Sequence, residues 1–246
     1  DGKLYAMPSF GSSEGTCQYL HLREDWRNNL GLPVPETTDD MLQILRAFTK
    51  DDPDGNNASD TWGLNVHKNV ANALEGFFAC FGSYPLQWVD DSNGNLVNGS
   101  LQPEAKEVLV ILNKLYDENV INKEFVTKTP AKATEDYVAG RCGMVFMPHW
   151  LYNDVLPAYV KEQNIDWESY ALPSNDDSPA MTPRRINSGG GYVVNKNVKN
   201  PEALIKMFNL YFEKCWGETQ EYHMWIDHTL PDGTIVDNYR NISPIS

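Results

Sequence analysis

The chain has 246 residues, of which 41% are hydrophobic and 22% are charged. This composition is typical of a folded globular protein and excludes general disorder, and the length predicts one or two domains. With 20 basic and 34 acidic residues the formal charge is −14, which excludes nucleic acid and anionic membrane surfaces as expected partners. Because no apolar run reaches the roughly 18 residues of a membrane span, we expect no direct membrane insertion.

Two features of the composition bear on function. The chain contains 7 Trp and 12 Tyr, and a flat ring with one polar atom suits either a protein core or stacking on a sugar. The cysteines show no C-x-x-C spacing, which argues against a metal or redox motif. We expect buried thiols at all four positions: Cys17, Cys80, Cys142 and Cys215.

Hydrophobic spacing and turn residues predict the secondary structure of the first part of the chain. Residues 37–40, Thr-Thr-Asp-Asp, supply capping side chains before an apolar pattern at helical spacing. The expected elements are, in order, a strand ended by Pro8, a strand over 17–23, a helix over 24–30 stopped by Gly31, a helix after residues 37–40, a strand over 62–66 and a helix over 70–81.

The rest of the chain continues to alternate helices and strands. Asn93-Gly94 favours the tip of a surface hairpin over 90–98, and Leu109 belongs to the expected inner stripe of a helix over 104–119. The elements expected after these are a helix over 131–139, a strand over 143–147, a helix over 150–163, a loop over 173–187, a strand over 192–195 and a helix over 201–214. This alternation predicts an α/β fold with short strands.

One loop carries a regular series of oxygen donors. They fall at positions 1, 3, 5, 7 and 9 of the loop: Asp52, Asp54, Asn56, the Ala58 carbonyl and Asp60. This is the spacing of an EF-hand loop, which surrounds Ca²⁺ with six to eight oxygens. Asn57 replaces the usual Gly at position 6 and Gly63 replaces the bidentate Glu at position 12, so the expected affinity is weak. The alternative is an Asx-rich turn without a metal.

Residues 11–15 match the G-x-S-x-G motif of serine hydrolases, with Ser13 as the candidate nucleophile. That motif requires a helix directly after the serine, because the helix N-terminus supports the oxyanion site. Residues 16–22 alternate as a strand does. A serine hydrolase is therefore the alternative function from another class.

Seven segments carry a resemblance to a known family. They are GKLYAMP, YLHLREDW, LGLPVPETTDDMLQILRAF, DPDGN…DTWGL, LNKLYDENVINKEF, GRCGMVFMPHW and GGGYVVNKNVKNPEAL. In this order they resemble family 1 of the extracellular solute-binding proteins of ABC importers, the maltodextrin- and alginate-binding kind and related lipoproteins of Gram-positive bacteria. The resemblance runs over most of residues 2–213.

The resemblance implies a periplasmic-binding-protein-like (type II) α/β lobe with part of the second lobe, joined by hinge strands that close the lobes on a ligand. Residues 1–13 would be a strand of the first lobe and its crossover, residues 14–186 the second lobe, and residues 187–246 the return crossover with partial first-lobe elements. Most of the first lobe would be absent. No catalysis is implied.

The family also implies site residues. Trp150 stands where relatives place an aromatic ring under the sugar, and residues 12–18 and 68–72 fall where relatives contact ligand. The candidate ligand-binding residues are Trp150, Glu14, Gln18, Lys68, Asn69, Tyr84, Trp88 and Arg184. For the loop of oxygen donors, the alginate-binding branch implies the same Ca²⁺ ligands, although Thr61 stands where that branch has Glu.

The expected function is therefore an extracellular solute-binding component of a bacterial ABC transporter that captures an oligosaccharide without chemistry. The implied partners are the small-molecule ligand and the membrane permease subunits, and a lipid would anchor the full-length protein at the cell surface. Peptides or other solutes stay open as ligands. A structural surface domain without a small-molecule ligand is a third alternative.

Overall fold

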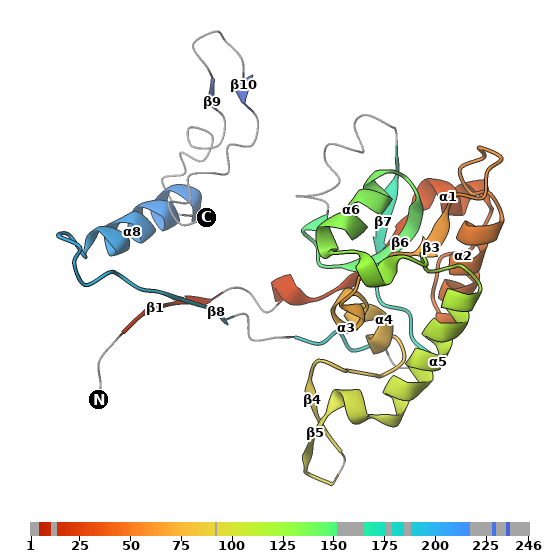
Figure 1. Ribbon diagram of the computed structural model, residues 1–246, viewed down its shortest axis with the longest axis horizontal. Coiled ribbons are helices and arrows are strands. Elements are labelled where there is room, and N and C mark those ends of the chain that lie inside the picture. The colour runs from red at the N-terminus through yellow and green to blue at the C-terminus, as the bar shows by residue number, and fades with distance from the viewer. Residues whose placement is uncertain are drawn as a thin grey trace. The chain divides into compact units, whose positions relative to one another are not determined.

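The computed structural model describes residues 5–10, 14–91, 93–151, 165–175, 179–184, 188–216, 228–229 and 235–236. By its contacts the chain divides into a larger unit, residues 11–187, and a smaller unit, residues 1–10 with 188–246 (Figure 1). The boundaries expected after residues 13 and 186 lie close to these divisions. The assignment of the smaller unit to a first lobe stays a prediction.

A four-stranded mixed sheet forms the centre of the larger unit. Its strands lie in the order β3 (Trp62–Leu64), β6 (Cys142–Met147), β2 (Tyr19–Arg23) and β7 (Trp167–Tyr170). β3 and β6 are parallel, whereas β2 is antiparallel to both of its neighbours. The strands predicted over 17–23, 62–66 and 143–147 are confirmed, with ends shifted by one or two residues.

Helices flank this sheet. They are α1 (Glu24–Asn29), α2 (Thr38–Lys50), α3 (Val70–Ala73), α4 (Glu75–Ala79), α5 (Pro103–Asp117) and α6 (Pro130–Val138), with 3₁₀ turns η1 (Glu14–Thr16), η2 (Gly99–Leu101) and η3 (Phe125–Thr127). The expected caps of α2 form a capping box, in which the Thr37 hydroxyl accepts the Asp40 N–H at 3.1 Å and the Asp40 carboxylate accepts the Thr37 N–H at 2.9 Å. Among the helices of the described residues, none is long and apolar enough to cross a membrane.

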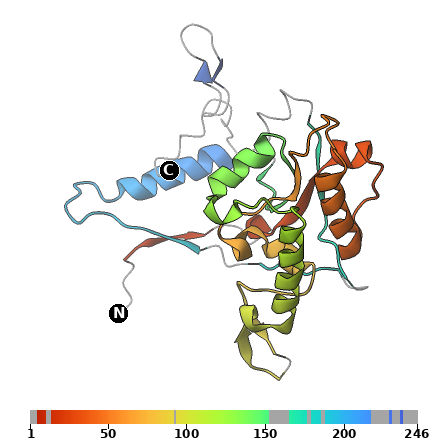
Figure 2. The ribbon, with the colours of Figure 1, turned by 45° about the vertical axis from the view of Figure 1, so that its right-hand side comes forward.

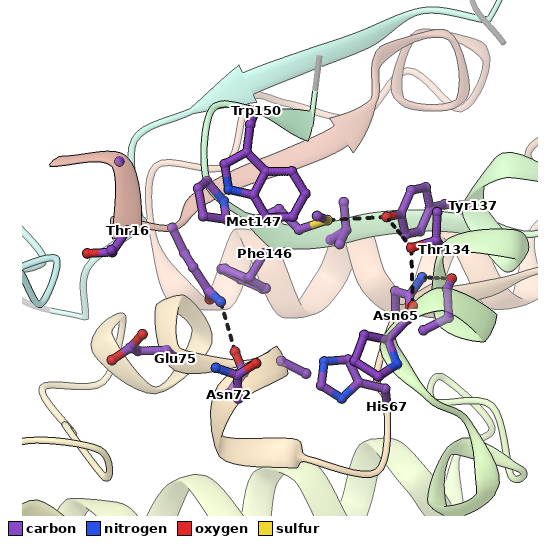
Figure 3. A pocket seen from close by; sticks show the side chains of 17 residues that line it. Thr16, Asn65, His67, Asn72, Glu75, Thr134, Tyr137, Phe146, Met147 and Trp150 are labelled. Atoms are coloured by element: carbon purple, nitrogen blue, oxygen red, sulfur yellow. Dashed lines mark hydrogen bonds between the residues drawn. The ribbon is translucent and has the colours of Figure 1, made fainter. Parts of the chain in front are cut away.

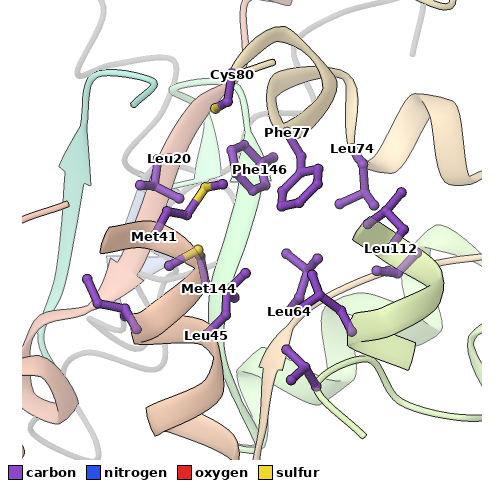
Figure 4. Close-up of a cluster of buried hydrophobic side chains, with 14 of the residues drawn as sticks. Leu20, Met41, Leu45, Leu64, Leu74, Phe77, Cys80, Leu112, Met144 and Phe146 are labelled. Atoms are coloured by element: carbon purple, nitrogen blue, oxygen red, sulfur yellow. The ribbon is translucent and has the colours of Figure 1, made fainter. Parts of the chain in front are cut away.

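The main hydrophobic core lies on one face of the sheet (Figure 4). Leu20 of β2 and Met144 and Phe146 of β6 are buried there together with side chains of α2, α4 and α5. Gly143 permits this close packing, because a Cβ at that position would lie 2.2 Å from the Phe48 ring of α2. The absence of a side chain at Gly143 therefore lets β6 and α2 approach closely.

A second, smaller cluster includes α6. It joins Tyr137 of α6 to Val145 of β6 and Trp167 of β7, and the rings of Tyr137 and Trp167 meet edge to face at 6.2 Å. Cys80 and Cys142 are buried thiols, and burial raises the pKa of each to about 12. Cys17 is also buried. Buried thiols are thus confirmed at these three positions, and the side chain of Cys215 lies outside the described residues.

A two-stranded hairpin extends from the larger unit in both ribbon views (Figure 1, Figure 2). β4 (Trp88–Asp90) pairs antiparallel with β5 (Leu96–Asn98), and Gly94 between them adopts a φ of 83°. Glycine has no Cβ to oppose this left-handed conformation, so the hairpin predicted from Asn93-Gly94 is confirmed.

The smaller unit contains a second pair of strands. β1 (Met7–Phe10) pairs antiparallel with β8 (Ser188–Tyr192), and α8 (Ala203–Trp216) follows. The rings of Tyr192 and Phe208 meet at 4.9 Å, so the helix packs against the end of β8. Two short strands, β9 (His228–Thr229) and β10 (Ile235–Val236), pair with each other.

Two strand boundaries differ from the prediction. The first strand continues through Pro8, which lies opposite Gly191, because a proline is tolerated where its missing N–H is not needed by the partner strand. The strand expected over 192–195 instead occupies Ser188–Tyr192, glycines included. Pairing with β1 supplies the extended conformation that the glycines do not themselves favour.

Two helical predictions were also incomplete. Leu109 was expected to face inward but is 55% exposed, because the buried stripe of α5 runs through Ala105, Val108, Leu112 and Leu115. The helix expected over 70–81 is divided into α3 and α4 at Leu74.

The helix expected over 150–163 falls mainly on residues 152–164, outside the described part of the chain.

Candidate ligand-binding pocket

A cavity of about 430 Å³ lies in the larger unit beside the end of β6 (Figure 3). Its lining comes from the segment before β2, the segment from β3 to α4, helix α6, and the end of β6. These residues are Gly15, Thr16, Gln18, Asn65, His67, Asn72, Ala73, Glu75, Pro130, Ala133, Thr134, Tyr137, Val145, Phe146, Met147, Pro148 and Trp150.

The parallel pairing of β3 and β6 explains where the cavity forms. Parallel strands end at the same edge of a sheet, and ligands of open α/β sheets bind outside that edge. Asn65 and His67 follow β3, and Pro148 and Trp150 follow β6. The turn of the chain after each strand therefore brings these four side chains to one place.

One wall of the cavity is aromatic and apolar. The Trp150 side chain is 37% exposed, and its indole lies near Met147 and Phe146 (Figure 3). The Tyr137 hydroxyl donates to the Thr134 hydroxyl at 3.0 Å and also lies 3.3 Å from the Met147 sulfur. This wall offers a flat apolar face to a ligand, with polar groups at its edge.

The opposite wall depends on the side-chain amide of Gln18. Its Nε2 donates to the Asn72 carbonyl at 2.9 Å, and its Oε1 accepts the Gly76 N–H at 2.8 Å. In a continuous helix the Gly76 N–H would donate to the Asn72 carbonyl directly. The amide of Gln18 replaces that bond, so the helix divides at Leu74, and Asn72 and Glu75 both line the cavity.

His67 is a neutral imidazole at the cavity wall. Burial lowers the pKa of His67 below its usual value of 6.5. Its Nδ1 accepts the backbone N–H of Asn69 at 3.2 Å, which assigns the proton of the neutral ring to Nε2. The Nε2–H is a hydrogen-bond donor of fixed direction.

Glu75 brings a carboxyl group to the same wall. The residue is 4% exposed, and Gln87 Nε2 donates to Glu75 Oε1 at 3.3 Å. Asn65 is also buried, and its Nδ2 donates to the Ala133 carbonyl of α6 at 2.7 Å. The polar groups of the cavity are thus held in place by other parts of the protein, as expected for a preformed site.

His21 supports the cavity from within the sheet. It lies on β2, 1% exposed, with Nε2 2.8 Å from the Met147 carbonyl and Nδ1 2.8 Å from the Ser169 hydroxyl. The carbonyl can only accept, so Nε2 carries the proton and Nδ1 accepts from the serine. Burial lowers the pKa of His21 to about 4.

The structure brings two of the candidate residues, Gln18 and Trp150, into the cavity lining. Lys68 and Asn69 lie on the chain between His67 and Asn72 but outside the lining. Both are exposed. Whether they contact a ligand stays a prediction.

The other four candidates lie outside the lining as well. Glu14 and Arg184 form an exposed ion pair at 3.4 Å. Tyr84 is partly buried against the main core, and Trp88 on the hairpin is 67% exposed. Conversely, sequence reasoning missed Asn65, His67 and Glu75. Asn65 lies near the end of the strand predicted over 62–66 and His67 directly follows it, which was the available signal.

The loop of oxygen donors is held together by Asn56. Its Nδ2 donates to Asp54 at 2.9 Å and to Asp60 at 3.2 Å, and its backbone N–H donates to Asp52 at 3.1 Å. The pKa of Asp54 is raised by burial and by the nearby carboxylates of Asp60 and Asp52. Among the described residues, no group of three or more His, Cys, Asp or Glu forms a metal site.

Gly63, at position 12 of this loop, cannot carry a ligand. A Cβ there would lie 2.2 Å from the Leu45 carbonyl oxygen of α2. Thr61 donates its hydroxyl to the Phe48 carbonyl at 2.9 Å and is buried. Its side chain is therefore engaged with α2.

The described residues also disfavour the hydrolase alternative. Ser13 lies outside them, but the residues after it form the short turn η1 and then strand β2. A nucleophile elbow needs a helix at that point, so the architecture required by the G-x-S-x-G motif is not found there.

Comparison with known proteins places these observations in a family. A family model described as bacterial extracellular solute-binding protein matches residues 18–214. Lipoprotein LipO of Bacillus subtilis (strain 168) is 35% identical over 152 residues, which are 59% of this chain and 29% of LipO. The polygalacturonan/rhamnogalacturonan-binding protein YtcQ of the same strain is 31% identical over 147 residues, 58% of this chain and 28% of YtcQ.

A solved structure shares the fold over nearly the whole chain. The ABC-transporter substrate-binding protein FusA of S. pneumoniae, in complex with kestose, matches with a TM-score of 0.69 and 19% identity, over 95% of this chain and 48% of FusA. This likeness confirms the predicted type II periplasmic-binding-protein fold. The chain spans about half the length of this structure, and its matched residues cover less than a third of each of the two curated relatives.

We predict that Gln18→Glu destabilises the larger unit. The substitution places an oxygen against the Asn72 carbonyl and removes a hydrogen bond, which costs about 0.5–1.5 kcal/mol of unfolding free energy. Chemical denaturation measures the change. Gln43→Glu, at an exposed position of α2, adds the same charge and serves as the control. Equal stability of the two variants would contradict the role assigned to Gln18.

We also predict acid destabilisation through His21. In the unfolded chain His21 takes up a proton near its usual pKa of 6.5. In the folded protein the pKa of His21 is about 4, so the ring stays neutral between these two pH values. The unfolded state therefore binds more protons in this range, and stability falls by about 3 kcal/mol as the pH decreases across it. Above pH 6.5 this contribution is constant. Denaturation at several pH values tests this, and a His21→Gln chain with an unchanged slope would refute it.

Proposed function

Because the chain belongs to the bacterial extracellular solute-binding protein family, we propose that it contains the sugar-binding pocket of an ABC importer's solute-binding component, and that its ligand is an oligosaccharide. One observation carries this proposal: the Trp150 indole and the polar side chains of His67, Asn72 and Glu75 line one cavity. Sugars present apolar C–H faces and polar hydroxyl edges, and this cavity offers both complements. YtcQ, by its name, and FusA, in its complex with kestose, bind carbohydrates.

In this proposal the protein captures its ligand without breaking or forming covalent bonds. A sugar ring stacks on Trp150, and the His67 Nε2–H donates to a hydroxyl oxygen. The buried Asn65 and Tyr137 side chains keep the walls of the cavity in place. Nothing in this arrangement requires a nucleophile, so the serine hydrolase is not retained as a second function.

The proposed partners are the permease subunits of an ABC transporter in the membrane, to which the bound sugar is delivered. The proposed location is extracellular, with a lipid anchor on the full-length protein, by likeness to a relative named a lipoprotein. The ligand roles of Glu14, Lys68, Asn69 and Arg184 remain predictions, as do those of Tyr84 and Trp88.

We predict that Trp150→Ala abolishes sugar binding while leaving the fold intact. A ligand present at 100 times its dissociation constant stabilises the folded state by about 2.7 kcal/mol, which raises the melting temperature by a few degrees. Thermal denaturation with and without oligosaccharides measures this shift. In the Trp150→Ala chain the shift disappears, because the stacking surface is lost.

Trp88→Ala tests the other candidate tryptophan, because it removes the same side chain from the exposed hairpin, outside the cavity lining. If the pocket alone holds the ligand, this variant retains the full shift. A Trp150→Ala chain that retains the shift excludes the pocket as the sugar site. Absence of any shift with all oligosaccharides in the unmodified protein would refute the proposed function.

We further propose that the loop from Asp52 to Asp60 binds Ca²⁺. The donor types fit, because the carboxylates of Asp52, Asp54 and Asp60 each accept a hydrogen bond from Asn56, and carboxylate and amide oxygens are ligands that Ca²⁺ prefers. Burial, together with the neighbouring carboxylates of Asp52 and Asp60, raises the pKa of Asp54, and a bound cation would offset the repulsion among them. Another S. pneumoniae FusA structure is described as an EF-hand mutant, so a related loop occurs in that protein.

We predict that Ca²⁺ raises the melting temperature and that chelation reverses the rise. Asp54→Asn removes one carboxylate from the loop, so the Ca²⁺-dependent rise decreases or disappears. Asp117→Asn, at an exposed position of α5, makes the same chemical change away from the loop and retains the response. Identical melting curves with Ca²⁺ and with EDTA would show that the loop is an Asx-rich turn without a metal.

A further inference from the structure

We infer that the ligand of this pocket is an uncharged oligosaccharide and that Glu75 excludes sugars bearing carboxylates. This inference rests on the proposed function and narrows its substrate class. The proteins similar to this chain include both kinds of ligand. YtcQ is named for polygalacturonan, a polymer of acidic sugars, whereas FusA is in complex with kestose, which is uncharged.

The charges around the cavity carry the inference. Glu75 contributes an acidic side chain that is 4% exposed, and the described lining residues include neither Lys nor Arg. Inside a protein, where water is largely excluded, a charge acts on its neighbours far more strongly than in solution. A sugar carboxylate entering this cavity would meet repulsion without a compensating cation from the described lining.

The basic residues next to the lining do not alter this balance. Lys132, beside Ala133, is exposed and outside the lining, and Lys128 is buried in an ion pair with Asp136. Lys68 follows His67 but is exposed and outside the lining, so water screens its charge. Arg184 is paired with Glu14 at 3.4 Å, and both side chains are more than 60% exposed. Paired opposite charges offer little attraction to an anion, and the net charge of −14 adds to the repulsion.

His67 adds no positive charge either. Its burial favours the neutral ring, and its Nδ1 accepts the Asn69 N–H, which a proton on that nitrogen would oppose. The neutral ring donates one hydrogen bond from Nε2. Such a donor suits a hydroxyl or ring oxygen, whereas recognition of a carboxylate usually employs the charged fork of Arg.

Isothermal titration calorimetry on the full-length, unmodified protein tests the inference with three sets of probes. The first set is kestose and other uncharged oligosaccharides of hexoses and pentoses. The second is oligogalacturonates. The third is the methyl esters of these oligogalacturonates, in which the ring and linkage are kept and the charge is removed. We expect binding of at least one uncharged probe, and at least tenfold weaker binding of every oligogalacturonate.

The outcomes separate this inference from the proposed function. Oligogalacturonates that bind more tightly than both their methyl esters and the uncharged probes overturn the inference while the sugar-binding function stands. Failure of all three sets overturns the proposed function and the inference with it. These measurements use the unmodified protein, so they decide the question even if a variant fails to fold.

Glu75→Gln identifies the residue responsible. Removing the charge narrows the affinity gap between uncharged and charged probes by about tenfold, corresponding to 1.4 kcal/mol. A purely structural role of Glu75, through Gln87, would weaken both classes of ligand together and leave their ratio unchanged. Glu107→Gln removes the same charge from an exposed position of α5 and is expected to leave the ratio unchanged. An unchanged ratio in Glu75→Gln assigns no exclusion to this residue and overturns that part of the inference.

Discussion

The pocket depends on one side-chain amide placed between two backbone groups. Gln18 occupies the hydrogen bond that would otherwise join the Asn72 carbonyl to the Gly76 N–H. Because both backbone groups remain satisfied, dividing the helix leaves neither of them without a partner. The division at Leu74 lies between Asn72 and Glu75, and both residues line the cavity. A residue just before β2 thereby shapes a wall built nearly 60 residues later in the chain.

The wall of the cavity that carries Trp150 depends on the direction of the strands. β3 and β6 are parallel, so the segments that leave them emerge at the same edge of the sheet. β2, antiparallel to β6, carries His21 into the sheet beside the Met147 carbonyl, where a neutral imidazole joins β6 to β7. The same ring that orders the pocket edge makes the fold sensitive to acid, because its buried position disfavours the charge that protonation adds.

Elements governed by local interactions could be predicted from the sequence. The capping box of Thr37 and Asp40, and the hairpin turn at Asn93-Gly94, involve residues no more than four positions apart. The division at Leu74 could not be foreseen, since the residue that causes it is Gln18. Leu109 fitted the helical period, but α5 packs along a narrower stripe, and only the neighbouring elements decide which residues at its margin are covered. Trp150 could be proposed because its place in the sequence matches a family pattern. Glu75 had no such signal, because only the folded structure brings it to the cavity.

The proposed exclusion of acidic sugars depends on the burial of Glu75. A carboxyl group that is 4% exposed has given up most of its contact with water, and Gln87 replaces part of it. If the cavity merely needed a hydrogen-bond acceptor, an amide would serve without that desolvation. A negative charge accepts hydrogen bonds from sugar hydroxyls as an amide does, and in addition it repels sugars that carry carboxylates. Stacking on Trp150 distinguishes sugars poorly, because C–H faces are common to many of them, so charge supplies a discrimination that the aromatic wall cannot.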